Sequence, residues 1–152
     1  MRKILLKMSR IIAKHAWLYY LLNCTWGLPM TLIGTLTTLA LLPFRRPKRF
    51  AYAWRFEFGK TWGGVSLGIA FITDCLSITQ LHCHEYGHTF QNAIFGPFMP
   101  FVVAIPSMIR YWYRHLRYER KGLMPTTDYD AIWFEASATE IGIEAYSIYN
   151  LH

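Results

Sequence analysis

Two histidines and a glutamate stand in one short segment, His84-Glu85-Tyr86-Gly87-His88, with the spacing of a metal site. On a helix, residues four apart lie on the same face, one turn above the other. The imidazoles of His84 and His88 can therefore converge on one zinc ion, with Glu85 beside the metal rather than on it. In that position Glu85 can take a proton from a zinc-activated water. The segment predicts a hydrolytic zinc centre with Glu85 as the general base.

A zinc centre of this kind needs a third protein ligand. The candidates elsewhere in the chain are His82, His115, Asp128, Asp130, Glu135, Glu140, Glu144 and His152. Glu135 is favoured because the small side chains of residues 136–138 would let its helix approach the histidine helix closely. The apolar residues 132–134 before it indicate burial rather than a solvated carboxylate, and Glu140 points to the opposite side of the same helix. We therefore expect Glu135 to be the third ligand.

These residues resemble the gluzincins, HExxH metallopeptidases whose third ligand is a glutamate on a downstream helix. More closely, the chain resembles a family of small bacterial membrane-associated proteins with an HEYGH motif. The stretches that carry this resemblance are Trp62–Gly68, His84–His88, Phe95–Pro97, Ile105–Ser107 and Trp133–Glu135. The resemblance covers most of the chain after residue 50. It implies metallopeptidase chemistry near a membrane and supplies no substrate.

The chain departs from the gluzincin pattern at one position. Better-known gluzincins have an aspartate four residues after the ligand glutamate, where it orients a metal-bound histidine, and this chain has Thr139. A hydroxyl can still hydrogen-bond an imidazole, but without charge, and this weakens metal affinity or activity by about tenfold or more. Asp74 either positions a histidine or ends a strand. Candidates for stabilising an oxyanion are Tyr118, Tyr129 and His115.

The composition favours a membrane surface as partner. Of the 152 residues, 53% are hydrophobic and only 16% are charged, and the formal net charge is +7. The basic residues flank apolar runs, as is typical of contact with lipid headgroups. Nucleic-acid binding is the weaker interpretation. The three cysteines, Cys24, Cys75 and Cys83, include no CxxC pair, which argues against a disulfide scaffold or a cysteine zinc site.

The apolar run from residue 16 to residue 42 contains no charged side chain and is 27 residues long. That exceeds the roughly 20 residues that span a bilayer as a helix. Gly27 and Pro29 stand inside the run and can kink or reverse the helix. We therefore expect either a kinked crossing or a helical hairpin, with a basic amphipathic lead (1–15) before it and a basic linker (43–50) after it.

The rest of the chain predicts a small β-hairpin followed by helices. Strands are expected at 52–58 and 64–73, the motif helix at 77–93, a buried or membrane-dipping segment at 94–109, and a last helix at 128–142 that begins near Asp128 or Asp130. The fold class is mainly α and membrane-associated. Two regions are expected: a membrane segment with its basic flanks (1–50), and a zincin-like metal-binding domain (51–152).

Two functions follow from this pattern. The first is a membrane-associated zinc metallopeptidase that acts on a peptide or membrane protein, with zinc as its cofactor. The alternative is a non-catalytic membrane protein with a binding or regulatory role and a structural zinc site. A closed fourth ligand would mark the structural site, but His82 and Cys83 are poorly placed for it on the helix. The basic segments near the site favour the cytoplasmic side of a bacterial cytoplasmic membrane.

Overall fold

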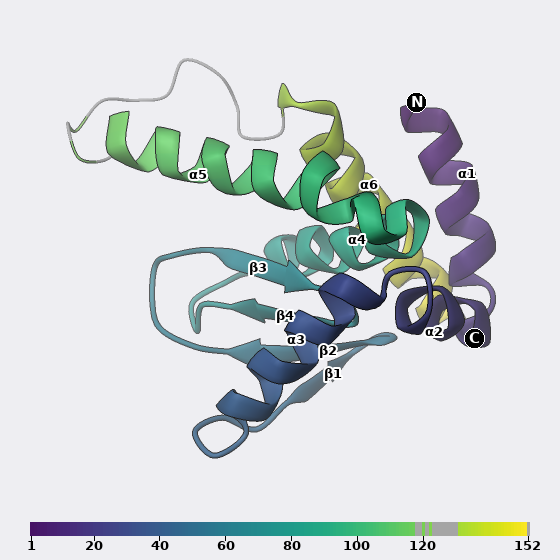
Figure 1. The fold of residues 1–152 in the computed structure, drawn as a ribbon, viewed down its shortest axis with the longest axis horizontal. Helices are drawn as coiled ribbons and strands as arrows, with labels where there is room; N and C mark the ends of the chain where they lie inside the picture. The colour runs from purple at the N-terminus through teal and green to yellow at the C-terminus, as the bar shows by residue number, and fades with distance from the viewer. Residues whose placement is uncertain (118–119, 121, 123–130, 152) are drawn as a thin grey trace.

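The computed structural model describes residues 1–117, 120, 122 and 131–151. The protein is mainly helical with one small mixed sheet (Figure 1). The elements, in chain order, are α1 (Arg2–Ala13), α2 (Ala16–Cys24), α3 (Leu28–Leu41), β1 (Lys48–Phe50), β2 (Ala53–Glu57), β3 (Gly64–Leu67), β4 (Ala70–Thr73), α4 (Thr79–Phe95), the 3₁₀ turn η1 (Gly96–Phe98), the π-helical turn η2 (Pro100–Ala104), α5 (Ile105–Arg117) and α6 (Trp133–Asn150).

Helices α4 and α6 pack against each other more closely than side chains would allow. A Cβ atom built on Gly87 of α4 would lie 1.8 Å from the carbonyl oxygen of Ala138 on α6. A Cβ atom on Gly142 of α6 would lie 1.7 Å from the carbonyl oxygen of Cys83. The two backbones therefore touch at both glycines. The sequence-based expectation that small residues bring these helices together is met by this contact.

The outer side of α6 is covered by α1. Leu5 and Ile12 of α1 are buried in the main hydrophobic core. Arg2 pairs with Glu140, and Arg10 pairs with Glu144. Exposed ion pairs of this kind contribute little to stability, so the buried apolar side chains of α1 supply most of its attachment. Residues 1–50 thus share one core with the rest of the protein.

The apolar run of residues 16–42 forms two helices rather than one. Helices α2 and α3 meet at 92°. Asn92 of α4 holds the corner, because its amide nitrogen donates to Asn23 Oδ1 at 2.7 Å and to the carbonyl of Gly27 at 3.1 Å. A side chain on Gly27 would collide with that amide, since its Cβ atom would lie 2.4 Å from Asn92 Nδ2. A buried polar network therefore explains the bend.

The sheet is larger than the expected hairpin. Its order is β1-β2-β4-β3, with β2 and β4 parallel and the other two pairs antiparallel. The expected strand at 64–73 is itself a hairpin of β3 and β4 that turns at Gly68, whose φ is +67°. The predicted linker supplies β1. In Figure 1, α3 crosses in front of the strands, whereas α4 lies along the β3 edge beneath α5.

The segment after α4 turns sharply at Gly96 and Pro97 and continues through η1 and η2 into α5. Among the described residues, no single helix is both long and apolar enough to cross a bilayer. Two bent pairs have the required length and composition together: α2 with α3, and Thr79–Phe98 with Pro100–Arg117 at 116°. Helix α6 begins at Trp133, later than expected, and Asp128 and Asp130 lie outside the described residues.

We predict that Gly142→Ala destabilises the protein, because the added methyl group would enter the backbone of α4 at Cys83. Overpacking of this kind costs about 1–3 kcal/mol and should lower Tm by several degrees. Thermal unfolding followed by circular dichroism measures the change. Ser147→Ala, on an exposed position of the same helix, is the matched control and should leave Tm almost unchanged. A Tm for Gly142→Ala at or above that of wild type would contradict the close contact.

Candidate metal centre

The structure brings His84, His88 and Glu135 together in one buried group that could hold a metal ion. Glu135 Oε2 lies 3.1 Å from His84 Nε2 and 3.3 Å from His88 Nε2. The two Nε2 atoms are 3.2 Å apart. The three atoms therefore form a nearly equilateral triangle. No fourth histidine, cysteine, aspartate or glutamate among the described residues joins them.

The size of this triangle fits a tetrahedral zinc site. Zinc bonds to histidine nitrogen and carboxylate oxygen are about 2.0–2.1 Å long, which places tetrahedral ligands about 3.3–3.4 Å from one another. The observed sides of 3.1–3.3 Å are close to that value. Two imidazoles and one carboxylate are also a donor set that zinc binds in proteins. Both the chemistry and the spacing of the donors fit the ion.

Gln91 fixes the orientation of the His88 ring. Its amide nitrogen donates to the carbonyl of Phe134 at 2.8 Å and to Ser137 Oγ at 2.9 Å. Gln91 Oε1 must therefore face His88 Nδ1, 2.7 Å away, and accept a hydrogen bond from it. A proton on Nδ1 leaves the Nε2 lone pair of His88 directed at the triangle. Although it is polar, the side chain of Gln91 is fully buried, and the spacing of the motif alone does not identify it as a partner of His88.

Thr139 has the corresponding position on the other ring. Its Oγ1 lies 2.8 Å from His84 Nδ1, and its hydroxyl donates to the carbonyl of Glu135 at 3.4 Å. Because the hydroxyl proton is donated to the carbonyl of Glu135, the hydroxyl oxygen accepts a hydrogen bond from His84 Nδ1. The Nε2 lone pair of His84 therefore also faces the triangle. The structure thus places the Thr139 hydroxyl beside the His84 ring, where the sequence predicted a hydrogen bond to an imidazole.

These hydrogen bonds leave three lone pairs facing one another without a proton between them. Both carboxylate oxygens of Glu135 are buried and form no hydrogen bond of good geometry among the described residues. Burial raises the pKa of this carboxyl, but hydrogen bonds from protonated imidazoles of His84 and His88 outweigh it and hold the pKa below its usual range. A metal ion between the three groups would take the place of those protons. Buried donors in this arrangement therefore suit a cation.

Glu85 lies in the wall of the same site, against the backbone of β3. A Cβ atom on Gly64 would lie 2.6 Å from Glu85 Oε1 and 2.9 Å from its carboxyl carbon. Only a glycine at this position of β3 leaves room for the carboxylate. Burial raises the pKa of Glu85, and His84 and His88 lower it by less. A carboxylate with a raised pKa accepts a proton more readily, as a general base must.

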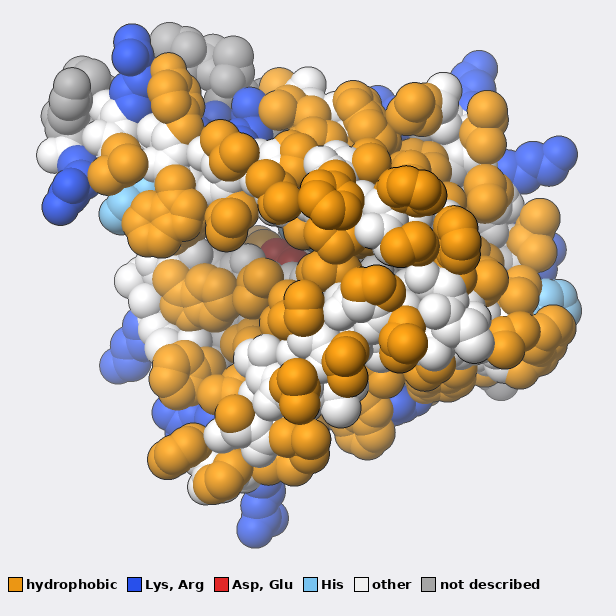
Figure 2. All heavy atoms as spheres, viewed as in Figure 1, with side chains coloured by type: hydrophobic (Ala, Val, Ile, Leu, Met, Phe, Trp, Pro, Cys, Tyr) orange, Lys and Arg blue, Asp and Glu red, His pale blue; other side chains and the backbone are white. Residues whose placement is uncertain are grey.

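A cavity of about 1050 Å³ opens next to the triangle. It reaches His84, His88 and Glu85, and its walls come from β3, α3, η2 and α5. Figure 2 shows the hollow with an acidic side chain at its bottom, and Glu85 is the acidic residue that lines it among the described residues. The cavity therefore gives a ligand access to His84, His88 and Glu85.

Other residues proposed from the sequence lie elsewhere. Asp74 accepts hydrogen bonds from the backbone nitrogens of Gly63 and Leu76, so it ends β4 and does not position a metal-binding histidine. His82 contacts Arg55 and Ser77 rather than the triangle. Cys83 is buried in the main core, on the α6 side of α4.

The structure does not place any of the three residues predicted to stabilise an oxyanion in the cavity among the described residues. His115 stacks on Tyr111 with ring centroids 6.2 Å apart, and it is not among the described residues that line the cavity. Tyr118 and Tyr129 lie outside the described residues. Tyr111 does line the cavity, and sequence reasoning did not single it out. Tyr111 follows Met108 by three residues, and Met108 also lines the cavity. This helical spacing could have identified Tyr111 from the sequence.

Comparisons with protein-family models, with curated proteins and with solved structures find no match to this chain. The geometry of the site therefore carries the functional argument.

We predict about one zinc ion per chain in wild-type protein purified from detergent extracts, measured by plasma mass spectrometry. Glu135→Ala removes one donor of the triangle and should lose most of the metal. Glu85→Gln leaves all three donors in place and should retain it. Equal zinc content in Glu135→Ala and wild type would contradict the proposed ligand set, as would a wild type that binds no zinc on reconstitution.

Thr139 offers a test of ring orientation that leaves the ligands unchanged. Thr139→Val removes the acceptor for His84 Nδ1 and should weaken zinc affinity by about 10- to 100-fold. Thr139→Asp supplies a charged acceptor and should bind zinc more tightly than wild type, while lowering the Tm of the metal-free protein. Competition with a chromogenic chelator measures both affinities. The same affinity in both variants would show that Thr139 does not act on His84.

Proposed function

We propose that this protein is a zinc-dependent peptidase that works at a membrane surface. The observation that carries the proposal is a three-donor triangle beside a large cavity, with Glu85 in the wall of that cavity. A structural zinc site is closed by a fourth protein ligand, whereas a catalytic site keeps one position open to water or substrate. The arrangement of the described residues supports the catalytic alternative over a binding or regulatory protein with structural zinc.

The residues divide the chemistry among them. His84, His88 and Glu135 would hold zinc, which supplies a Lewis acid and lowers the pKa of water to about 7. Glu85 takes a proton from the attacking water and passes it to the leaving amine. Burial raises the pKa of Glu85, which favours the first transfer, from water to the carboxylate. Gln91 and Thr139 hold the two imidazoles in the tautomer that the site requires.

An extended peptide is the substrate that the cavity walls favour. β3 is one of the two edge strands of the sheet, and each of its residues, Gly64–Leu67, lines the cavity. An edge strand offers unpaired backbone groups to which a peptide can add as a further strand. Met30, Met99 and Val103 also line the cavity and suit apolar side chains. The proposed substrate is therefore an extended segment with apolar residues near the cleaved bond.

The basic segments around the apolar runs favour the bacterial cytoplasmic membrane as the location, with the site on the cytoplasmic side. Peptides of membrane proteins are then the class of substrate nearest to the site. No nucleic-acid partner is proposed.

We predict that zinc-loaded wild type cleaves fluorogenic peptides with apolar residues and that Glu85→Gln lowers kcat/KM at least about 100-fold, because general-base catalysis is lost. Gly64→Ala should also lower kcat/KM, by about tenfold or more, because the new methyl group displaces the Glu85 carboxylate. Cleavage rates and zinc content are measured on the same samples.

Both variants should keep the zinc content of wild type, which separates loss of the base from loss of the metal. A zinc-loaded wild type that cleaves no better than Glu85→Gln would overturn the peptidase and support a structural metal site. An unchanged rate in Gly64→Ala would show that the position of Glu85 against β3 is unimportant for the reaction.

A further inference from the structure

We propose that the protein docks on an anionic lipid surface through one apolar face, with the mouth of the cavity opening onto the lipid. The apolar face is formed by exposed rows on α3 and α5. Its central residues are Leu32, Leu36 and Leu39 on α3 and Met108, Ile109 and Trp112 on α5. Docking does not depend on the proposed peptidase activity. The route by which a substrate would reach the metal centre rests on both.

The rows are regular surfaces of two helices. On each helix the exposed apolar residues recur at intervals of three and four, so they lie on one side of it. None of the described α5 residues is buried. Phe98 and Phe101 extend the surface between the two helices and are 60% and 70% exposed. Figure 2 shows hydrophobic side chains over both helices and around the hollow between them. An exposed apolar surface of this extent marks an interaction site.

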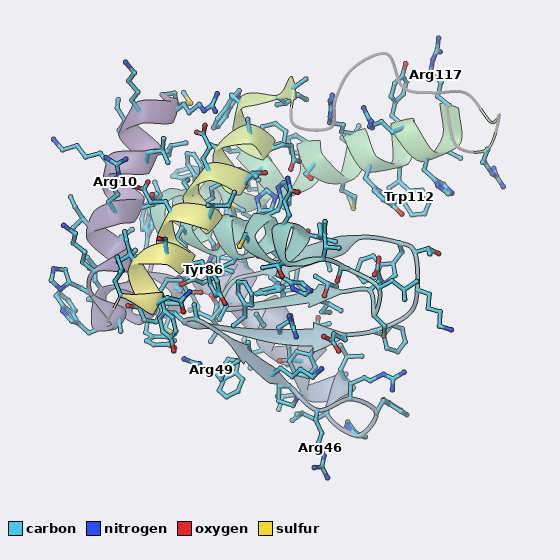
Figure 3. All side chains as sticks on the ribbon, turned by 180° about the vertical axis from the view of Figure 1, so that it is seen from behind. Arg10, Arg46, Arg49, Tyr86, Trp112 and Arg117 are labelled. Atoms are coloured by element: carbon cyan, nitrogen blue, oxygen red, sulfur yellow. The ribbon has the colours of Figure 1, made fainter. Side chains whose placement is uncertain are left out.

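Helix α5 has the pattern of a helix that lies in a membrane interface. Arg110, Arg114 and Arg117 follow one another at intervals of four and three. Arg114 lines the cavity beside Met108 and Trp112, whereas Arg117 is exposed at the end of the helix. In Figure 3, Trp112 points from α5 toward the sheet, whereas Arg117 points away from it. Amphipathic helices with tryptophan on one side and arginine on the other bind at the boundary between headgroups and acyl chains.

The charges around the apolar face identify the partner as anionic lipid rather than a second copy of this chain. In Figure 2, lysine and arginine side chains lie around the rim of the view. Arg45 and Arg46 follow α3 and are exposed, and Arg46 projects from the end of the molecule in Figure 3. The whole chain carries 16 basic and 9 acidic residues. Two such faces would bring like charges together, whereas anionic headgroups attract them.

Docking in this orientation sets the route to the metal centre. Met30 of α3 and Tyr111 and Trp112 of α5 line the cavity, so the two helices that would contact lipid also form its walls. A peptide at the membrane surface would enter without crossing bulk water. If the proposed function holds, the preferred substrate is a membrane-bound segment rather than a soluble peptide.

The test is co-sedimentation of the full-length chain with vesicles of phosphatidylcholine alone and of phosphatidylcholine with phosphatidylglycerol. We expect binding to the mixed vesicles, weakened by high salt, and much less binding to neutral ones. The double variant Leu36→Glu/Ile109→Glu should lose at least about tenfold in partition coefficient. Arg45→Gln/Arg46→Gln/Arg117→Gln should lose about 10- to 100-fold on the mixed vesicles only.

The matched control is Ile143→Glu on α6, the helix nearest the viewer in Figure 3. Ile143 is 51% exposed, comparable to Leu36 and Ile109 at 61% each, so an acidic residue there tests charge and folding without touching the apolar face. It should bind vesicles as wild type does, and circular dichroism should show that all variants are folded.

Three outcomes would overturn the proposal: no binding of wild type to either vesicle, equal loss in Ile143→Glu and the double variant, or a lipid-free dimer that the double variant dissociates. Vesicle binding by Glu85→Gln, equal to that of wild type, keeps this test separate from the peptidase. Failure of docking would leave the zinc and cleavage measurements intact, and failure of cleavage would leave docking intact.

Discussion

The metal centre depends on how closely α4 approaches α6. The side chain of Glu135 is short, and it must place one oxygen within 3.1–3.3 Å of two imidazoles on the neighbouring helix. Side chains between the helices would prevent this, and the contacts at Gly87 and Gly142 remove them. The same contact excludes water from Glu135, whose side chain is completely buried. The close contact of α4 and α6 therefore brings the three side chains together. It also buries the Glu135 carboxylate, whose negative charge is costly unless it is compensated.

The free-energy cost of burying the Glu135 charge links the stability of the fold to metal binding. Three lone pairs directed at one point repel one another, and Glu135, which is completely buried, has no exposed surface on which water could relieve them. A cation that binds the folded state and not the unfolded chain adds its binding free energy to stability. The apolar contacts of α1 and the Asn92 network act on the outer side of α6 and the far end of α4, so they hold the two helices in place around the site. The protein is thus built to keep together a group of donors that would otherwise separate.

The sequence predicted the parts of the site that follow from local geometry. The spacing of His84 and His88 placed both rings on one helical face, and the small residues after Glu135 indicated a close helix. Gln91 could not be recognised, because its role depends on Phe134 and Ser137, far away in the chain. The parallel pairing of β2 with β4 was missed for the same reason, because contacts between distant segments set it. The bend between α2 and α3 was expected from Gly27 and Pro29, but the contact of Asn92 with Asn23 at the corner was not. Asp74 had a local explanation, the end of a strand, and the structure favours it over a role near a histidine.

A neutral side chain at position 139 has a simple electrostatic reason. The site already contains two carboxylates, Glu85 and Glu135, and a divalent cation bound among neutral imidazoles would balance both. A third carboxylate beside His84 would leave one uncompensated negative charge among apolar walls, and such a charge is expensive to desolvate. Thr139 and Gln91 are neutral acceptors, so they fix both ring tautomers without adding charge. A net-neutral centre suits a cavity whose mouth would face lipid, where the surrounding medium screens charge poorly.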